Sequence, residues 1–464
     1  MSEQPNKSYQ PTDHHDASWY RERFLRHTSQ IFGLSWPAIM SRMGAMVMAT
    51  VDTIMVGQYS TTELAYLNLG TGTFVMLALV MAYGMLLGTL VYSADAYGRG
   101  DYKSAGAVWR RSLPYAVGLG IICLLICLPS ETLFLWMGQT AEMAREGGKV
   151  MTIHGIGLFS HLVFFSCIAF LEGIEKPKVA MYAMVLANIV NVVLNYVLVH
   201  GWGDIPAMGA SGSAIATTIL RFLMAASMVL YILKAPSLEK FGVRIPWTGK
   251  WSDWAKQRVM GYAAALSLGA EVAAFSLLVV FAGWMGTEPV AAWGVVVNVI
   301  SLMFMLSAGI GSAASVRVGI ANSRHDRADV KMAGWTSLLL NTVGLIIVGA
   351  FVWWGAEGIT HFYTDDPALI NLIMPVMLLV PYVMPFDGGQ AVVSNALRGL
   401  GETWVPTVIQ AISYMLIMTP LSYYLGITLD QGIFGLMVSV WIGGVVSVLL
   451  LSWRFHTRSN YVGE

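Results

Sequence analysis

Long apolar runs constrain this chain more than any other feature. Runs of about 20 residues recur along it, which is the length that an α-helix needs to cross a bilayer. Of the 464 residues, 56% are hydrophobic and only 12% are charged, whereas a water-soluble protein of this size needs far more charge to cover its surface. The sequence therefore predicts an all-α integral membrane protein. The net charge of zero gives no basis for a nucleic-acid partner.

Twelve spanning segments are predicted, six in each half of the chain. The longest polar break lies between the sixth and seventh segments and contains two prolines and many charges. The predicted spans are 32–56, 65–92, 112–136, 150–172, 179–200 and 210–234, then 258–284, 289–316, 333–355, 370–396, 404–426 and 432–454. The expected organisation is an N-terminal tail (1–30), an N-lobe with helices 1–6 (31–234), a linker (235–257), a C-lobe with helices 7–12 (258–455) and a C-terminal tail (456–464).

The basic residues predict the orientation in the membrane. The two tails, the segments after even-numbered helices and the span ends that border them hold 23 of the 27 Lys and Arg residues, whereas the loops after odd-numbered helices hold only Arg145 and Lys149. Under the positive-inside rule, this bias places both termini and the linker in the cytoplasm.

The two halves resemble each other in sequence. The segment FLEGIEKPKVAMYAMVLANIVNVVLNYVL (170–198) aligns with ALRGLGETWVPTVIQAISYMLIMTPLSYYL (396–425), which places Gly173 over Gly399. A second pair, AYGRGDYKSAG (96–106) and GIANSRHDRADV (319–330), aligns at nearly the same offset. The common offset indicates a duplicated six-helix unit. Since six helices return the chain to its starting side, the copies are expected to share one orientation, with a pseudo-twofold axis along the membrane normal.

Several motifs resemble one known family. The first helix carries LSWPAIM and then VDTIMVGQ, the fifth carries NVVLN, the sixth GASGSAIAT and the tenth FDGGQAVVSNALRGLG. In this order, and over roughly residues 30–455, they are similar to the NorM branch of the multidrug and toxic compound extrusion (MATE) transporters. The resemblance implies two six-helix bundles around a V-shaped central cavity. It also implies export of lipophilic organic cations in exchange for inward sodium ions, protons or both.

The same resemblance sets the expected partners and location. They are lipophilic cationic small molecules and membrane lipid, with no cofactor beyond the coupling ion. We expect a monomeric multi-pass protein of a bacterial cytoplasmic membrane, and not an enzyme.

Three acidic residues interrupt the apolar runs: Asp52, Glu271 and Asp387. A carboxylate in a bilayer costs a few kcal/mol at least, so such groups usually line a cavity where a cation or proton neutralises them. The resemblance makes Asp52 the N-lobe ion-coupling residue, with Asn191, Asn195 and Thr217 as partners. The two asparagines are four residues apart and share a helix face, and their oxygens suit a hard cation or a held proton. The alternative is a structural role, because Asn and Thr often bond between membrane helices.

Glu271 and Asp387 are the expected C-lobe ion-coupling pair. If the two carboxyls face each other, repulsion and desolvation favour binding of a proton or a cation such as sodium. Neither predicted helix offers a basic residue to neutralise them. Pro381 and Pro385 flank Asp387, and Val383 lies one turn before it, where a polar or aromatic ligand is expected.

Other residues in the spans leave alternatives open. Pro37 is a candidate hinge, since proline removes a helical hydrogen bond, but a static kink is an equal alternative. Arg42 either extends to the cytoplasmic interface or pairs with an internal acid such as Glu172, and Arg221 raises the same question. His154 and His161 share a face of one helix and are interpreted as packed residues or as a proton relay.

Two other functions were weighed. A lipid-linked sugar flippase of a related fold would need basic residues in its cavity, for which Arg42 and Arg221 are candidates, but three buried acids favour cationic cargo. A membrane-embedded enzyme would need a catalytic motif, and HExxH, GxSxG in context and paired-Asp protease motifs were not found. A Walker motif was not found either, so the sequence predicts transport without ATP.

Overall fold

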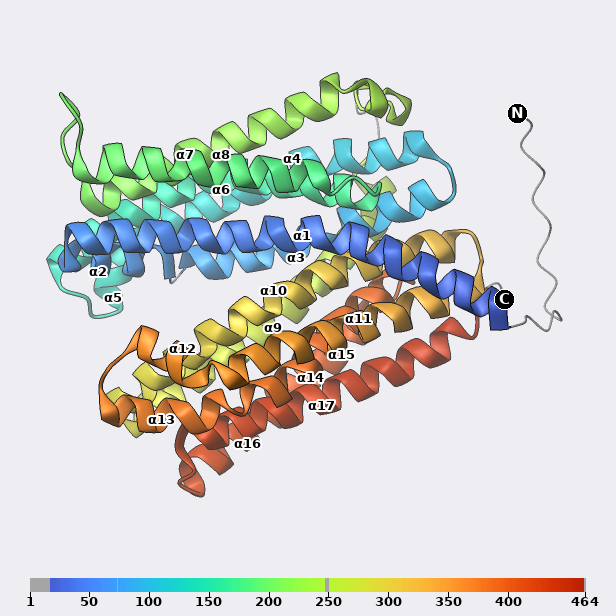
Figure 1. Ribbon diagram of the computed structural model, residues 1–464. Coiled ribbons are helices and arrows are strands. Elements are labelled where there is room, and N and C mark those ends of the chain that lie inside the picture. Colours follow the sequence, from blue (N-terminus) through green and yellow to red (C-terminus); the bar gives the residue numbers. More distant parts are fainter. Residues whose placement is uncertain (1–16, 73, 247–249, 463–464) are drawn as a thin grey trace.

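The computed structural model describes residues 17–72, 74–246 and 250–462. Eleven helical segments in these ranges are long and apolar enough to cross a membrane, or twelve if the bent pair α13–α14 is counted as one span. The helices form two bundles that diverge toward the end carrying α5, α12 and α13, so that the molecule has the shape of a V (Figure 1). The prediction of an all-α membrane fold with two six-helix bundles is confirmed.

The N-lobe begins with the longest helix of the chain, α1, which has 43 residues. The predicted second span lies within a candidate membrane span over Thr61–Gly98, whose described residues are assigned to α2 and α3 on either side of residue 73. The N-lobe helices are α1 (Ala17–Tyr59), α2 (Thr61–Gly72), α3 (Phe74–Gly98), α4 (Tyr102–Cys127), α5 (Ser130–Trp136), α6 (Ala141–Gly173), α7 (Lys178–His200) and α8 (Gly209–Lys234). In the described part of the linker, two short 3₁₀ helices follow, η1 (Pro236–Phe241) and η2 (Trp251–Trp254).

The C-lobe contains two spans that are not regular helices. α13 and α14 meet at an angle of 53°, and two π-helical segments interrupt the span that begins with α15. The C-lobe elements are α9 (Ala255–Met285), α10 (Thr287–Ser323), α11 (Arg327–Trp354), α12 (Ala356–Tyr363), α13 (Pro367–Met377), α14 (Val380–Gly399), α15 (Trp404–Ala411), η3 (Ile412–Met418), α16 (Thr419–Tyr423), η4 (Tyr424–Thr428) and α17 (Gly432–Ser459).

The turns of the two lobes confirm the internal repeat. Gly100 and His325 both have positive φ, 75° and 56°, and each precedes an aspartate that caps the following helix. Glu175 and Gly401 likewise have φ of 60° and 83°. The first pair is 225 residues apart and the second 226, which matches the offset of the sequence alignment. Gly100 and His325 each lie two residues after the end of a helix, α3 and α10 respectively. Glu175 and Gly401 likewise lie two residues after the ends of α6 and α14.

The first helix differs from its prediction at the N-terminal end. The expected tail covers residues 1–30, but the chain is already helical at Ala17, and residues 1–16 lie outside the described part. Arg23 donates hydrogen bonds to Asp326 and Asp329 at the start of α11. These contacts stabilise the polar end of α1 against the C-lobe, and α1 then runs along the N-lobe (Figure 1). The helix therefore connects the two bundles.

The bundles touch at one end of the molecule. Along α3 and α9 the backbones approach so closely that a Cβ added to Gly84 would lie 2.4 Å from Ala265 Cα, and one added to Gly88 would lie 2.1 Å from the Gln257 carbonyl oxygen. Only glycine permits such an approach. Both described chain ends lie at this same end, because Asn460 accepts a hydrogen bond from Arg327 at the start of α11, next to the Arg23 contact.

Candidate functional site

The N-lobe acid, Asp52, lies in a cage of donors from two other helices. It is 7% exposed. On α7, the side-chain amides of Asn191 and Asn195 donate to its Oδ1 at 3.0 and 2.7 Å, and on α8 the Thr217 hydroxyl donates to Oδ2 at 2.8 Å. The structure therefore brings together all four residues that were predicted for this site. Their role in ion coupling stays a prediction.

The amides of this cage serve the carboxylate in a different way from the one expected. They donate to Asp52 through nitrogen, whereas the sequence predicted a shell of oxygens. The Oδ1 atoms of Asn191 and Asn195 are buried and have no hydrogen-bond partner among the described residues. Buried polar atoms usually have partners, so these two oxygens are acceptors available to a cation or to water beside the carboxylate.

A second group of polar side chains lies deeper in the N-lobe. His154 is 4% exposed, and its Nδ1 lies 3.4 Å from an Arg221 nitrogen. His161 contacts the Tyr83 hydroxyl through Nε2. The two histidines therefore have different partners, and in the described residues no hydrogen bond links them to each other. Arg221 points inward from α8 and does not extend to the interface.

In the C-lobe, Asp387 is bound by one residue that the sequence analysis missed. Asp387 is 2% exposed, and the Tyr414 hydroxyl donates to its Oδ1 at 2.9 Å. Tyr414 is fully buried and belongs to η3, where the wider π-helical turn rotates side chains relative to an α-helix. It supplies the aromatic hydroxyl that was expected at Val383, which is itself buried in the apolar core.

Glu271 lies on α9, is partly exposed, and forms no hydrogen bond or ion pair with the described residues. It interacts electrostatically with Asp387, and the Tyr414 side chain interacts with both carboxyls. The two acids are therefore close enough to influence each other, but no direct bond joins them in the described chain. Of the three membrane acids, Glu271 has the greatest need of a cation or proton.

A buried polar network lies one helical turn from these acids. The Oε1 atom of Gln410 accepts hydrogen bonds from Ser267, from Ser394 at 3.1 Å and from Arg398 at 3.4 Å. Its amide nitrogen donates to Gln390. The network joins α9, α14 and α15 beneath Glu271 and Asp387.

Arg398 corrects the expectation that neither C-lobe helix carries a basic residue near the acids. The predicted tenth span ends at residue 396, but α14 continues to Gly399 and buries Arg398 at 3% exposure. The electrostatic field of Arg398 acts on Glu271. The repeat alignment contained a signal for this, because it places Arg398 over Glu172, the buried acid of the N-lobe.

Arg42 on α1 pairs with Glu172 on α6 within the N-lobe and also reaches the C-lobe through Ser312. The Arg42 guanidinium lies 3.4 Å from Glu172 Oε1 and donates to the Ser312 hydroxyl of α10 at 2.5 Å. Of the two alternatives for Arg42, the structure shows the pairing with Glu172 and not extension to the interface. Pro37 lies inside the unbroken α1 one turn before this arginine, and its role as a hinge stays a prediction.

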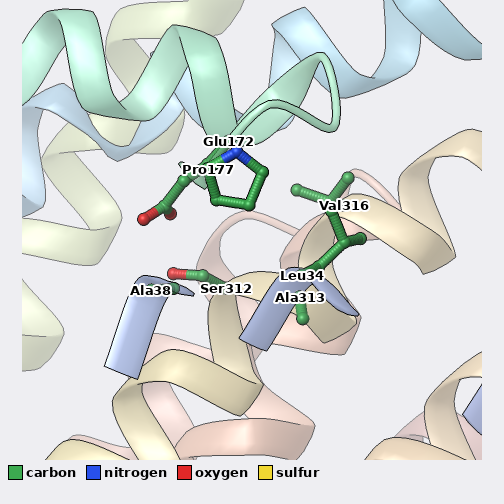
Figure 2. Close-up of a pocket in the computed structure, with 7 residues that line it drawn as sticks. All are labelled: Leu34, Ala38, Glu172, Pro177, Ser312, Ala313 and Val316. Atoms are coloured by element: carbon green, nitrogen blue, oxygen red, sulfur yellow. The ribbon is translucent and has the colours of Figure 1, made fainter. Parts of the chain in front are cut away.

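A small cavity adjoins this contact (Figure 2). Its volume is about 10 Å³, which is room for about one water molecule. It is enclosed by α1, the end of α6 and α10, through Leu34, Ala38, Glu172, Pro177, Ser312, Ala313 and Val316. No organic substrate would fit it, and the close approach of α3 and α9 described above brings the lobes into direct contact at this end.

An ion pair joins the lobes at the same end. Arg317 on α10 is buried and donates to Glu175, in the turn after α6, at 2.7 Å. Glu175 has φ of 60°, which costs a non-glycine residue roughly 1–2 kcal/mol, whereas the equivalent position in the C-lobe is Gly401. The carboxylate thus remains at a strained position where it pairs with the other lobe.

The cysteines and the other residues that could ligate a metal show no sign of a metal centre in the described part of the chain. Cys123, Cys127 and Cys167 are buried and are not joined in disulfides. Within the described ranges, no three His, Cys, Asp or Glu side chains gather as a metal cluster would require. A sodium site would instead use one carboxylate with amide and hydroxyl oxygens.

Comparisons with known proteins agree with this architecture. The MatE family model matches the chain twice, over residues 37–197 and 263–424, once in each repeat. The chain belongs to the MATE family. A relative described as a probable multidrug resistance protein NorM, from Caulobacter vibrioides, is 33% identical over 92% of this chain and 91% of its own length. A protein of the same description from Rhizobium meliloti is 28% identical over 91% of each chain.

Solved MATE structures share the fold. The crystal structure of the eukaryotic MATE transporter AtDTX14 matches with a TM-score of 0.85 at 20% identity, covering 95% of this chain and 99% of that one. A transporter of the MOP superfamily from Pyrococcus furiosus matches with a TM-score of 0.86 at 20% identity, covering 95% of this chain and 98% of that one. The chain is thus a NorM-type member of the MATE family, as the motifs predicted, and its family consists of membrane transporters.

Proposed function

We propose that this protein is a secondary active antiporter that exports lipophilic organic cations and is driven by the inward flow of sodium ions or protons. The relatives named above are described as multidrug resistance proteins. The single observation that carries the proposal is that both lobes hold membrane-embedded acids with no cationic side chain in an ion pair with them among the described residues. Such acids need an exchangeable cation or proton.

The two acidic sites have different chemistry. Asp52 has three donors and is partly compensated, whereas Glu271 has none in the described chain and Asp387 has one. Since compensation by donors lowers the need for an external charge, the C-lobe pair is the primary ion-coupling site. Asp52, Asn191, Asn195 and Thr217 are the second site, and Pro37 is the hinge in α1.

The sealed end of the molecule supports an orientation. Both described chain ends lie there, and the positive-inside rule assigns this end to the cytoplasm. The conformation is then open away from the cytoplasm, as an exporter is after it has carried its substrate outward. We infer a monomer in a bacterial inner membrane with both termini cytoplasmic.

The flippase alternative loses its main support in this structure. It required free basic residues, but Arg42 is bound to Glu172 and Ser312, and Arg221 lies beside His154. The relatives also carry the description of drug transporters. Cationic cargo is therefore the better interpretation.

The test uses inverted membrane vesicles that contain the full chain, without ATP. A sodium or proton gradient imposed in the exchange direction should drive uptake of a fluorescent organic cation such as ethidium. Empty-vector vesicles and the Glu271→Gln protein are the controls. Accumulation against a drug gradient after both ion gradients have been collapsed would refute the antiport mechanism.

A further inference from the structure

We propose that Arg398 limits the C-lobe to one coupling cation per transport cycle, by acting as a built-in counter-charge for the acid pair. This inference rests on the proposed function, because it takes Glu271 and Asp387 as the coupling acids. Arg398 would then be a specificity-determining residue for the transport reaction, although it need not touch the ion.

The first argument is the surroundings of Arg398 itself. Its side chain is 3% exposed, and no carboxylate of the described residues lies within 4.0 Å of it. One nitrogen donates to the neutral Gln410 amide at 3.4 Å, and Nε is buried without a partner. A buried cation with only a neutral partner is expensive. Nearby negative charge is therefore needed to hold Arg398 in this position.

The network places Glu271 near enough to provide that charge. Gln410 Oε1 binds Arg398 and also Ser267. Ser267 precedes Glu271 by four residues on α9, and residues with this spacing have Cβ atoms about 5–6 Å apart on one helix face. Glu271 and Arg398 thus lie on two sides of the same amide. Their mutual electrostatic interaction agrees with this placement.

Asp387 belongs to the same group of side chains. We call this group, Glu271, Arg398, Gln410 and Asp387, the column. Gln390, three residues after Asp387 on α14, accepts from the Gln410 amide nitrogen. Tyr414, four residues after Gln410, donates to Asp387. The column therefore contains two carboxylates and one guanidinium around one amide, and its net charge is minus one when both acids are ionised.

This charge sets the expected number of cations. In a medium of low dielectric constant, each uncompensated charge costs several kcal/mol. One sodium ion or one proton brings the column to neutrality, whereas a second leaves it positive. Without Arg398 the same two acids would have a charge of minus two and would accept two monovalent cations. The arginine therefore determines how many ions the C-lobe exchanges.

The experiment counts cations bound to purified protein in detergent, with Asp52→Asn in every variant so that only the C-lobe contributes. Bound radioactive sodium and protons released into weakly buffered solution are measured separately, which distinguishes the two ions. The parent and R398K should bind one cation, R398Q two, and E271Q none. The double variant E271Q/R398Q again has a net charge of minus one, so it should regain one cation.

The outcomes separate the two levels of inference. If the Asp52→Asn parent binds neither sodium nor an exchangeable proton, the coupling site of the proposed function is wrong. If the parent binds one cation but R398Q also binds one, only the role of Arg398 is overturned. Should R398Q aggregate, the comparison of E271Q with E271Q/R398Q decides alone, and failure of the double variant to regain binding overturns the counter-charge.

Discussion

The ion pair between Arg317 and Glu175 should hold the converging ends of the lobes together. It joins α10 of the C-lobe to the turn after α6 of the N-lobe at 2.7 Å, and the Arg317 side chain is 7% exposed whereas that of Glu175 is 30% exposed. Glu175→Gln would leave a buried guanidinium without its charged partner. We expect the sealed conformation to become less stable relative to the conformation in which the lobes separate at this end.

The magnitude follows from the burial of the pair. Removing one partner of a fully buried pair costs about 3–5 kcal/mol, and an exposed pair contributes about 0.2–1 kcal/mol. With one partner buried and the other partly exposed, we expect about 1–3 kcal/mol, which changes the ratio of the two conformations by about 5–150-fold. The inter-lobe hydrogen bond from Arg42 to Ser312 should be unaffected, because different side chains form it.

The assay measures the distance between the lobes by electron paramagnetic resonance. Spin labels are attached at Lys178 and Trp404, which begin α7 and α15 at equivalent places of the repeat and are both exposed. The three native cysteines are buried and should react little. Glu175→Gln should raise the population with the longer distance.

The controls test charge and backbone separately. The exchanged pair Glu175→Arg with Arg317→Glu restores attraction and should return the distances to those of the parent. Glu175→Gly removes the carboxylate and also the strain at φ of 60°, so it should open the contact although the turn itself becomes less strained. Unchanged distances in Glu175→Gln, or equal distances in the exchanged pair and the single variant, would show that the contact does not hold the lobes.

Three further predictions concern the coupling residues. Glu271→Gln and Asp387→Asn should each abolish ethidium export from cells; Asp387→Asn should fold at least as well as the parent because a buried charge is removed, whereas Glu271→Gln also removes negative charge near Arg398 and should fold no better than the parent; export at the parental rate would show that the pair is not the coupling site. Asp52→Asn should reduce transport and change its pH profile, since one titrating group is lost; an unchanged profile would leave only the interhelical bonding role. Pro37→Ala should restore a helical hydrogen bond, straighten α1 and slow transport without weakening ion binding; parental transport rates would identify a static kink.

The sequence was sufficient for the fold and for most of the candidate residues. Apolar runs predicted the spans, and the 225–226-residue offset predicted the repeat that the turns at Gly100 and His325 confirm. The cage around Asp52 could be predicted because Asn191 and Asn195 have helical spacing and lie in a motif that resembles the family. These features depend on local periodicity or on motifs, both of which a single sequence contains.

The residues that were missed depend on contacts between distant segments. Tyr414 reaches Asp387 from a π-helical turn, and the deviation of that turn from regular α-helical geometry is not visible in its apolar sequence. Arg398 was placed outside its helix because the predicted tenth span ends at residue 396, whereas α14 continues to Gly399. The structure instead buries it beside Gln410, where polar partners from three helices converge.

The two repeats differ in charge at the turn that follows their fourth and tenth spans. The N-lobe has Glu172 and Glu175 there, and the C-lobe has Arg398 and Gly401 at the equivalent places. Both N-lobe acids contact arginines at the junction of the lobes, whereas Arg398 interacts electrostatically with Glu271 of its own lobe. One copy of the turn therefore controls contact between the lobes, and the other controls the charge of the ion site. An antiporter must make its conformation depend on its bound ion. It therefore needs both a contact that sets the conformation and a charge that sets ion binding. Two identical turns would supply only one of these, whereas the two diverged turns supply both.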